Sequence, residues 1–470
     1  MTPAISNTAA LTIEEKNTFV IEANGTNFYV SIKFINDRGQ SKTINKNEFS
    51  KVIFESVYTT PFVMGRLQLI EHDQQNKFKP AIGNTAGNTN YEPTGSGGEF
   101  IHISIKQQIN STRHRQFTLL NKAFIIKGIS ESMTGNAPML NYYFADIEFG
   151  ALLYNRLPWS TVNMVGDSSQ LSATDKGVPV SDAISNLLTT FCSNRNHNII
   201  NTDKWNPSST KTEYTLHTNQ APLDALNDLM LKYISKEHND MGLLLRHAGK
   251  FKLQSLNNIF KYESNPVASI RINNNDDRSN YTGSRTASYF RSKYQLIPVH
   301  ISDVQFHPKN PDTGVSVVID HSISSYNIKD KLFKLYNNKG TVINLKKTFN
   351  DIISHLPGSE TKEVDVTRPV FIANKNQKIV YENFNNSEFL GKTILQSKFV
   401  DSADRVSFHI PGNLLPSAGK FIGIELGGIP GNKFMKNVSG FWFVLQNTTT
   451  LTQNTFKTFL VSSKFDREKV

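Results

Sequence analysis

Residues 439–466 read SGFWFVLQNTTTLTQNTFKTFLVSSKFD and carry the plainest structural signal of the chain. Aromatic and β-branched residues fill Phe441–Leu445 and again Phe456–Val461, a composition typical of strands. The residues between them, Asn447–Asn454, are polar and predict a turn. The stretch therefore predicts a β-hairpin near the end of the chain.

The same β character recurs upstream, between Thr18 and Gly150. Apolar residues occupy every second position from Phe28 to Phe34, which is the period of a half-buried strand. Further strands are expected at Val52–Phe54, Ile101–Ile105 and Tyr143–Phe149. Several short strands separated by turn residues predict a barrel or a sandwich for this region.

A small α/β module is expected after Pro179, where the apolar period changes. One helix face spans Ile184–Phe191, with Ser181 as its N-cap. A second helix starts at Pro222, because the first helical turn tolerates proline. A short strand at Tyr214–Leu216 and a hairpin over Gly242–Leu256 complete the module.

The rest of the chain returns to β patterns after a polar boundary at Asn273–Ser279. Strands are expected at Val299–Val304, Val315–Ile319, Val406–Ile410 and Ile422–Leu426, and one helix at Phe349–Leu356. Two stretches rich in Gly, Asn, Thr and Ser predict loops, namely Gly83–Gly98 and Asn163–Gly177.

Length and composition indicate a folded chain of several domains. The 470 residues exceed the roughly 250–300 that one core accommodates, so about two to four domains are expected. The single cysteine, Cys192, excludes an intrachain disulfide and favours synthesis in a reducing cytoplasm. We expect no signal peptide in Met1–Thr12. No apolar stretch reaches the roughly 18 residues of a spanning helix, so no membrane insertion is expected.

The net charge of +11 leaves two interpretations open. A basic excess is one signature of nucleic-acid binding. The alternative is a mildly basic surface that faces acidic partner proteins. We favour the second, because the basic residues are scattered singly and their densest cluster, Arg113–Arg115, is short.

No motif predicts nucleotide binding or nucleophilic catalysis. The nearest approach to a phosphate-binding loop, Gly412 with Gly419 and Lys420, has the wrong spacing. Cys192 lies on or beside the apolar face of its expected helix, where a free cysteine behaves as a small buried hydrophobe.

Clusters of titratable residues give no stronger signal. Glu71–Asp73 places three such groups together, but neighbours on a strand point to opposite faces. His300, Asp303 and His307 have the composition of a metal site, yet their uneven spacing matches no ligand motif. We therefore expect no catalytic, cofactor-binding or metal site, and a chain that is not an enzyme.

The order of several degenerate motifs resembles one protein family. Phe54–Tyr58 with Gly65–Ile70 is similar to a first hairpin, and Phe124–Ser130 with Tyr142–Phe149 to sheet-closing strands. The helices and hairpin of 179–256 follow, and 439–466 closes the series. Together they resemble the baseplate hub proteins of contractile-tailed bacteriophages, the family of phage tail late-control proteins. These hubs often carry a histidine where Asn447 and Thr448 stand here, which leaves the subfamily open.

The resemblance implies a mainly β, multidomain fold. It consists of two tube-like β-barrels, an inserted α/β domain and a C-terminal β-domain. The implied ranges are an N-terminal arm at 1–17, a first tube-like barrel at 18–155, the α/β module at 179–262, a second β region that is part of the second barrel at 280–356, and a C-terminal β-barrel region with the closing hairpin at 357–470.

The resemblance also implies a function and a set of partners. The chain would be a structural hub, a homotrimer that joins the hexameric tail tube protein to the trimeric central spike protein. It would contact other baseplate or wedge proteins, and DNA or the tape measure would touch it passively in the channel. Such a hub belongs to the virion tail baseplate, is assembled in the host cytoplasm and needs no cofactor.

Two other functions of a tail protein remain open. A tail-associated peptidoglycan-degrading enzyme would need two carboxylates that converge in a cleft, and one sequence cannot give their separation. A receptor-binding or glycan-binding tail protein would also be rich in β-structure. Such proteins are typically fibrous trimers with repeats, and no short-period repeat is visible here.

Overall fold

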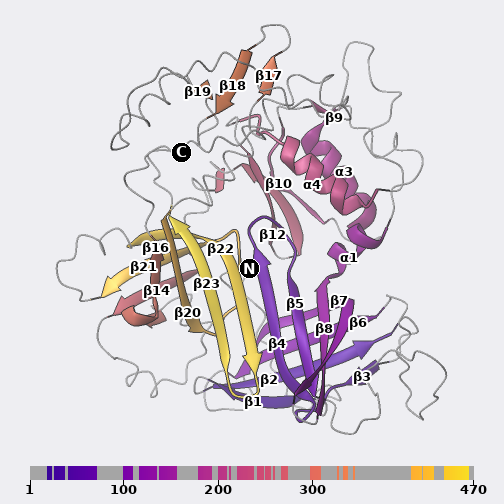
Figure 1. Cartoon of the computed structure of the whole chain (residues 1–470), viewed down its shortest axis with the longest axis vertical. Coiled ribbons are helices and arrows are strands. Elements are labelled where there is room, and N and C mark those ends of the chain that lie inside the picture. The colour runs from indigo at the N-terminus through magenta and orange to yellow at the C-terminus, as the bar shows by residue number, and fades with distance from the viewer. Residues whose placement is uncertain are drawn as a thin grey trace, which may run out of the picture. The chain divides into compact units, whose positions relative to one another are not determined.

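Strands dominate the computed structural model of the chain (Figure 1), so the prediction of a mainly β protein is confirmed. The chain divides into two units. Unit 1 comprises 1–154, 263–307 and 405–464, and unit 2 comprises 155–262, 308–404 and 465–470. Within these units the structure describes residues 18–23, 26–36, 41–70, 99–108, 116–134, 137–155, 178–192, 199–208, 211–212, 220–237, 241–247, 249–255, 258–259, 266–273, 297–307, 325–327, 332–336, 342–343, 404–414, 417–427 and 439–464.

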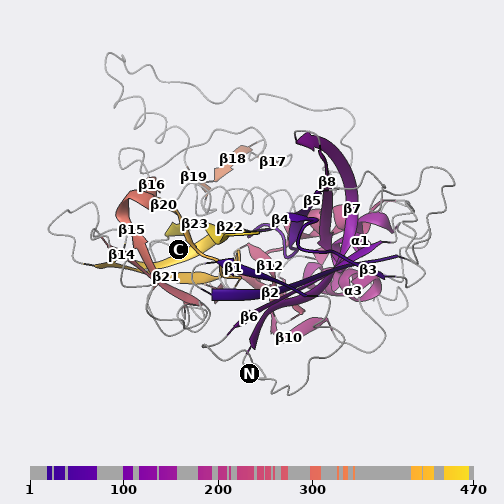
Figure 2. The same ribbon diagram turned by 90° about the horizontal axis from the view of Figure 1, so that it is seen from below.

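Unit 1 contains a 15-stranded sheet, of which β1–β8 form what we call the N-terminal half. These strands are antiparallel and follow the order β1-β2-β6-β7-β8-β5-β4, with β3 paired to β2. Figure 2 shows β7 and β8 as a long curved pair. The bounds are β1 Phe19–Ala23, β2 Thr26–Ile35, β3 Ser41–Thr43, β4 Phe49–Val57, β5 Met64–Ile70, β6 Phe100–Gln108, β7 Gln116–Thr134 and β8 Ala137–Asp146.

The N-terminal half curls around one apolar core. Strand β2 buries Phe28, Val30, Ile32 and Phe34 while its other residues are less buried, so the alternation predicted for this strand is confirmed. Strands β4, β5, β6 and β8 add their own inward residues to the same core. Burial of each such side chain stabilises the fold by about 1.5–3 kcal/mol.

A second set of strands, β14–β16 and β20–β23, forms the C-terminal half of the sheet. From β22 one path runs through β21 and β14 to β15, and the other runs through β23 and β20 to β16. The two paths end on strands that follow each other in the chain, because β15 and β16 are joined by the 3-10 turn Ile301–Asp303 and Val304. The bounds are β14 Ala268–Asn273, β15 Ile297–His300, β16 Gln305–His307, β20 Asp404–Pro411, β21 Phe421–Gly427, β22 Gly440–Thr452 and β23 Phe456–Lys464.

The closing hairpin is present, but the prediction of a polar turn at Asn447–Asn454 is wrong. Strand β22 continues to Thr452, and the connection to β23 is only Gln453–Thr455. Threonine is β-branched and packs well on a pleated surface, so the run Thr448–Thr450 extends the strand although it is polar.

The strand predicted over Tyr143–Phe149 is also too long. Strand β8 ends at Asp146, and helix α1 occupies Ile147–Tyr154. The alternation continues by chance into the first turn of α1, whose Phe149 and Leu152 are buried at helical spacing.

Unit 2 contains the expected helices, α3 (Val180–Cys192) and α4 (Pro222–Lys232), and the expected hairpin of β12 (Gly242–His247) with β13 (Lys250–Ser255). Strand β10 (Ile200–Trp205) pairs in parallel with β13. The other strands are β9 (Val178–Pro179), paired with β11 (Lys211–Thr212), and a separate sheet of β17 (Ser325–Asn327), β18 (Leu332–Tyr336) and β19 (Val342–Ile343).

Ser181 is not the N-cap predicted for α3. The helix begins at Val180, so Ser181 lies in its first turn. Its hydroxyl accepts the backbone N–H of Ser208 at 3.2 Å and donates to Asp182 at 3.1 Å. The side chain thus fixes a neighbouring segment instead of the helix start.

Several predictions lie outside the described residues and stay predictions. They are the arm at 1–17, the loops Gly83–Gly98 and Asn163–Gly177, the strands Tyr214–Leu216 and Val315–Ile319, and the helix Phe349–Leu356. In the part of the chain that the structure describes, no helix is long and apolar enough to cross a membrane.

Candidate functional site

Strand β22 belongs to both halves of the main sheet. Its first residues, up to Phe443, pair with β21, while Gln446–Thr452 pair with β4. Strand β23 follows along its other side. The changeover lies at a bulge at Leu445, whose carbonyl accepts the backbone N–H of Tyr58 at 2.9 Å. One strand therefore joins the two halves through main-chain hydrogen bonds.

Aromatic side chains fill the space around this changeover. Phe443 is fully buried and packs against Phe421 and Tyr58, with ring centroids 5.4 and 6.0 Å apart. Trp442, on the other face of β22, is part of the core of the C-terminal half. We call the changeover at Leu445 the joint. Aromatic rings on both faces stabilise it, because aromatic pairs of this geometry add about 0.5–1.5 kcal/mol beyond their buried area.

Polar side chains separate the two apolar cores along the hairpin. Along β22 this polar seam consists of Asn447 and Thr449, and Thr458 continues it on β23. Thr449 donates to Asn447 Oδ1 at 2.9 Å, and its hydroxyl lies 3.1 Å from that of Thr458. Thr458 also accepts the backbone N–H of Asn413 at 2.9 Å and donates to the carbonyl of Asn413 at 3.0 Å. Because these groups are hydrogen-bonded, their burial costs little.

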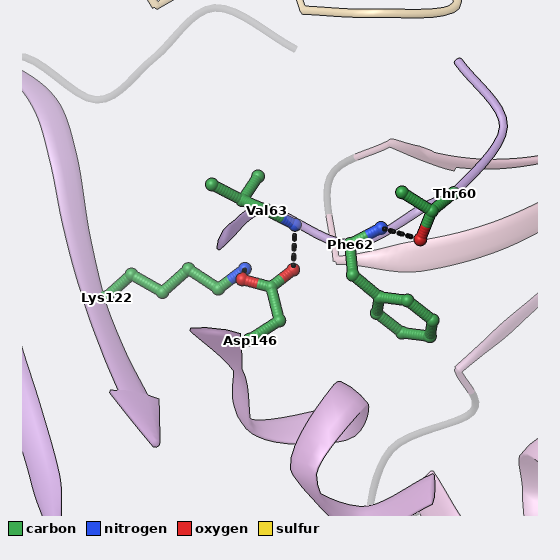
Figure 3. A network of polar contacts seen from close by, with 5 residues as sticks. All are labelled: Thr60, Phe62, Val63, Lys122 and Asp146. Atoms are coloured by element: carbon green, nitrogen blue, oxygen red, sulfur yellow. Dashed lines mark hydrogen bonds and ion pairs between the residues drawn. The ribbon is translucent and has the colours of Figure 1, made fainter. Parts of the chain in front are cut away.

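A buried carboxylate fastens the corner where β8 meets α1 (Figure 3). Asp146 accepts from Lys122 Nζ at 2.6 Å and from the backbone N–H of Val63 at 3.1 Å. The backbone N–H of Asp146 donates to the carbonyl of Val63 at 3.0 Å. Asp146 has no exposed side-chain surface, whereas Lys122 is 31% exposed. The ion pair thus links β7, β8 and the segment before β5.

The outer surface of β5 and β8 carries a second polar group. Tyr143 is 42% exposed, and Ser130 donates to its hydroxyl at 3.4 Å. Hydrogen bonds from Ser130 and then from Arg66 lower the pKa of Tyr143 below its ordinary value. Arg66 stands directly opposite Tyr143 in the ladder.

The residues that the sequence suggested for a metal lie in β15, in β16 and in the turn between these strands. His300 ends β15, Asp303 is exposed in the 3-10 turn, and His307 ends β16. Among the described residues, no group of three or more potential ligands could hold a metal ion. The stretches Glu71–Asp73 and Arg113–Arg115 lie outside those residues.

The cysteine and the glycines considered in the sequence lie at defined places in the fold. Cys192 is half-buried at the end of α3 and forms no disulfide. Gly419 has a φ of +82°, a conformation that favours glycine. A Cβ on Gly412 would meet the ring of Phe456, so this glycine permits close packing.

Sequence reasoning did not predict the polar seam, Asp146 or Arg66. One signal for the seam was available, because Asn447, Thr449 and Leu451 alternate with the outward residues of β22. Asp146 offered a weaker signal, an acid directly after the apolar and aromatic run Tyr142–Ala145. Arg66 looks like any solvated basic residue until its neighbours are known.

No protein-family model and no curated protein matches the sequence. Solved structures similar to the chain include the tail protein from Neisseria meningitidis, with 12% identity and a TM-score of 0.45 over 93% of this chain and 96% of that chain. The 43 kDa tail protein of prophage MuSo2 from Shewanella oneidensis has 8% identity and a TM-score of 0.45, covering 92% and 97%.

An Escherichia coli component of the type VI secretion system has 6% identity and a TM-score of 0.37, covering 89% of this chain and 74% of that chain.

Proposed function

We propose that the chain is a structural hub of a phage-type tail baseplate, a homotrimer that joins a hexameric tail tube to a trimeric central spike. The observation that carries the proposal is the shared strand β22. The hairpin on which the family resemblance rests is also the element that joins two β units in one chain.

Two β units in each chain offer a way to match two symmetries. The N-terminal half curls around one core, and the strands of the C-terminal half pack around another. If each half acts as one tube-like barrel, three chains supply six similar wall segments to a sixfold tube. Each of the same three chains then contacts one subunit of the threefold spike.

The joint suits a part that transmits force. Residues Gln446–Leu451 are paired on both sides, with β4 and with β23, so the two halves cannot separate without breaking main-chain hydrogen bonds. A ring of three such chains would need large interfaces, of about 2,000–5,000 Å² for obligate assemblies. We place it in the baseplate of the tail, with tube, spike and other baseplate or wedge proteins as partners.

Negative-stain electron microscopy of the purified full chain tests this proposal. Class averages down the particle axis should show rings with a central channel and six similar lobes. Single particles without rings, both alone and after co-expression with tube and spike proteins, would overturn it.

We further propose that the hub is not catalytic. Turbidity of a peptidoglycan suspension should stay constant when the protein is added. Clearing that is abolished by a single Glu→Gln substitution would contradict this part of the proposal and favour a cell-wall hydrolase.

A further inference from the structure

Six neighbouring strands of unit 1 share one continuous outward-facing row. From β23 through β22, β4, β5 and β8 to β7, the register places directly side by side Lys457, Thr450, Ile53, Arg66, Tyr143 and Gly128. The alternate residues of these strands point into the N-terminal core. We call these six residues the outer row.

Positive charge prevails on and beside the outer row. Lys457 and Arg66 belong to the row, and Lys51 lies on the same face two residues before Ile53. Neighbouring strands are about 4.8 Å apart, so Lys457 and Arg66 are separated by about 14 Å, with Lys51 between them. Among the described residues, none forms an ion pair with any of these three cations.

Arg66 is the centre of this charge. Its Nε is buried, and no described residue accepts a hydrogen bond from it. Because this atom is shielded from solvent, a ligand from outside reaches the guanidinium through its terminal Nη groups. Tyr143 beside it is 42% exposed, and its hydroxyl is hydrogen-bonded to Ser130 and to Arg66. Arg66 and Tyr143 thus lie together on the outer face of the sheet.

We propose that the outer row is a docking site for a partner protein that places a carboxylate against Arg66 and Tyr143. A guanidinium binds a carboxylate through two parallel hydrogen bonds, which its two Nη groups can supply. The tyrosine ring adds an apolar wall beside the pair. The site therefore selects an acidic side chain presented by a folded or extended segment.

The charge pattern favours a protein over a nucleic acid as the occupant. Glu55 is exposed on the same face, two residues after Ile53, and would repel a polyanion that tracks along the strands. Phosphate-backbone binding is driven by several cations acting together. Arg66 is half-buried and the face also carries the acid Glu55, a setting that fits a point contact in a mixed protein interface.

A substitution at Gly128 offers a test that leaves Arg66 in place. A Cβ on Gly128 would meet no heavy atom within 4 Å, so longer side chains fit there. Gly128→Glu adds a carboxylate to the outer row next to Tyr143, within reach of Arg66. This carboxylate should compete with that of the partner for Arg66. Gly128→Gln has the same shape without the charge and is the matched control.

Binding is measured on the full chain with a hexaglutamate peptide as the probe. The arginine Nε–H region of the proton–nitrogen spectrum reports the contact, and Arg66→Gln identifies the resonance. We expect the peptide to shift this resonance and to saturate. Arg66→Gln and Gly128→Glu should each weaken binding about tenfold or more, since a charge-assisted hydrogen bond is lost. Gly128→Gln and the distant Lys33→Gln should change the affinity less than about twofold.

Two results would overturn the inference. Equal weakening by Lys33→Gln and Arg66→Gln would mean that the peptide senses only the overall charge. Tighter binding of an oligothymidylate than of hexaglutamate, lost in Arg66→Gln, would assign the site to nucleic acid. The inference goes beyond the hub proposal and does not depend on it, because failure to form rings leaves the peptide titration unaffected.

Discussion

The two halves of the main sheet differ in how the chain builds them. Strands β1–β8 come from one run of sequence, 19–146, whereas the C-terminal half is assembled from 268–273, 297–307 and 404–464. Closing a longer loop costs more entropy, and non-local pairs form later in folding. The N-terminal half can therefore be stabilised by its own contacts, and the C-terminal half depends on segments that arrive from far along the chain.

The two halves also differ in what fills them where they meet. Each core is apolar, but the hairpin between them buries hydroxyl and amide groups. Apolar packing tolerates several arrangements of similar volume, whereas a buried polar network has few satisfied geometries. The comparison suggests that the cores supply stability and that the seam fixes the register of the joint.

Removing one ring from a core should have the largest effect. Phe456 is fully buried in the N-terminal core, and its ring lies 4.8 Å from that of Phe28 in an edge-on contact. Phe456→Ala should lower the free energy of unfolding of the N-terminal half by about 3–5 kcal/mol, because apolar burial is lost and a cavity is left. Hydrogen exchange of β2 and β6 amides measures this free energy.

The counterpart in the other half is Phe408, buried in the C-terminal core. Phe408→Ala should lower protection of β14 and β21 by a similar amount and leave β2 and β6 less affected. Equal loss of protection throughout the sheet in both variants would mean that the two halves unfold as one unit, and the comparison would fail.

Loss of the carboxylate at the α1 corner should have the next largest effect. Asp146→Ala removes the partner of Lys122 and the acceptor of the Val63 N–H. Breaking a buried pair costs about 3–5 kcal/mol, but Lys122 is partly solvated, so we expect about 2–3 kcal/mol. Urea denaturation gives the value. Glu55→Ala, at an exposed site on β4, is the control and should change stability by less than about 0.5 kcal/mol.

Adding Lys122→Met separates the ion pair from the backbone contact. In the double-mutant cycle, a coupling of about 1 kcal/mol or more between positions 122 and 146 is expected. Additive effects would show that Asp146 acts through Val63 alone.

Removing one hydroxyl from the polar seam should lower stability even when the shape of the side chain is kept. Thr458→Val removes the acceptor of the Asn413 N–H and the contact with Thr449. We expect a loss of about 1–3 kcal/mol, because buried polar groups lose a partner. Thr450→Val, on the outward face of β22, should be neutral within about 0.5 kcal/mol. Similar stability of both variants in urea would mean that the seam does not fix the joint.

The sequence predicted the N-terminal half best because its signals are local. Alternation at Phe28–Phe34 and Ile101–Ile105 is a property of single strands, and the structure keeps it. The strand Ala268–Asn273 was not predicted, because it is a strand only through parallel pairing with β21 and β15, which are distant in the sequence. Asn447–Thr452 was predicted as a turn because its composition is polar, and its pairing on both sides is invisible in one sequence.

The candidate site was less predictable than the fold. The hairpin at 439–466 was found from its aromatic residues, but its role as a joint depends on β4, almost 400 residues away. Arg66 and Tyr143 are brought together only by the register of β5 with β8. Neither residue belongs to a motif, so only the pairing distinguishes them from ordinary surface residues.

The smallest effect is expected at Phe441, which contrasts with the buried Phe443 two residues later on the same face. Phe441 is 41% exposed, and its partner in the ladder with β21 is Gly423. Phe441→Ser should therefore change the stability of the isolated chain by no more than about 0.5 kcal/mol in urea. The exposed part of this ring adds apolar area that an interface with another chain can bury. Ring formation in electron micrographs should consequently fall in Phe441→Ser while the isolated chain stays folded. Unchanged rings would remove Phe441 from the assembly surface and confine the role of the hairpin to joining the two halves.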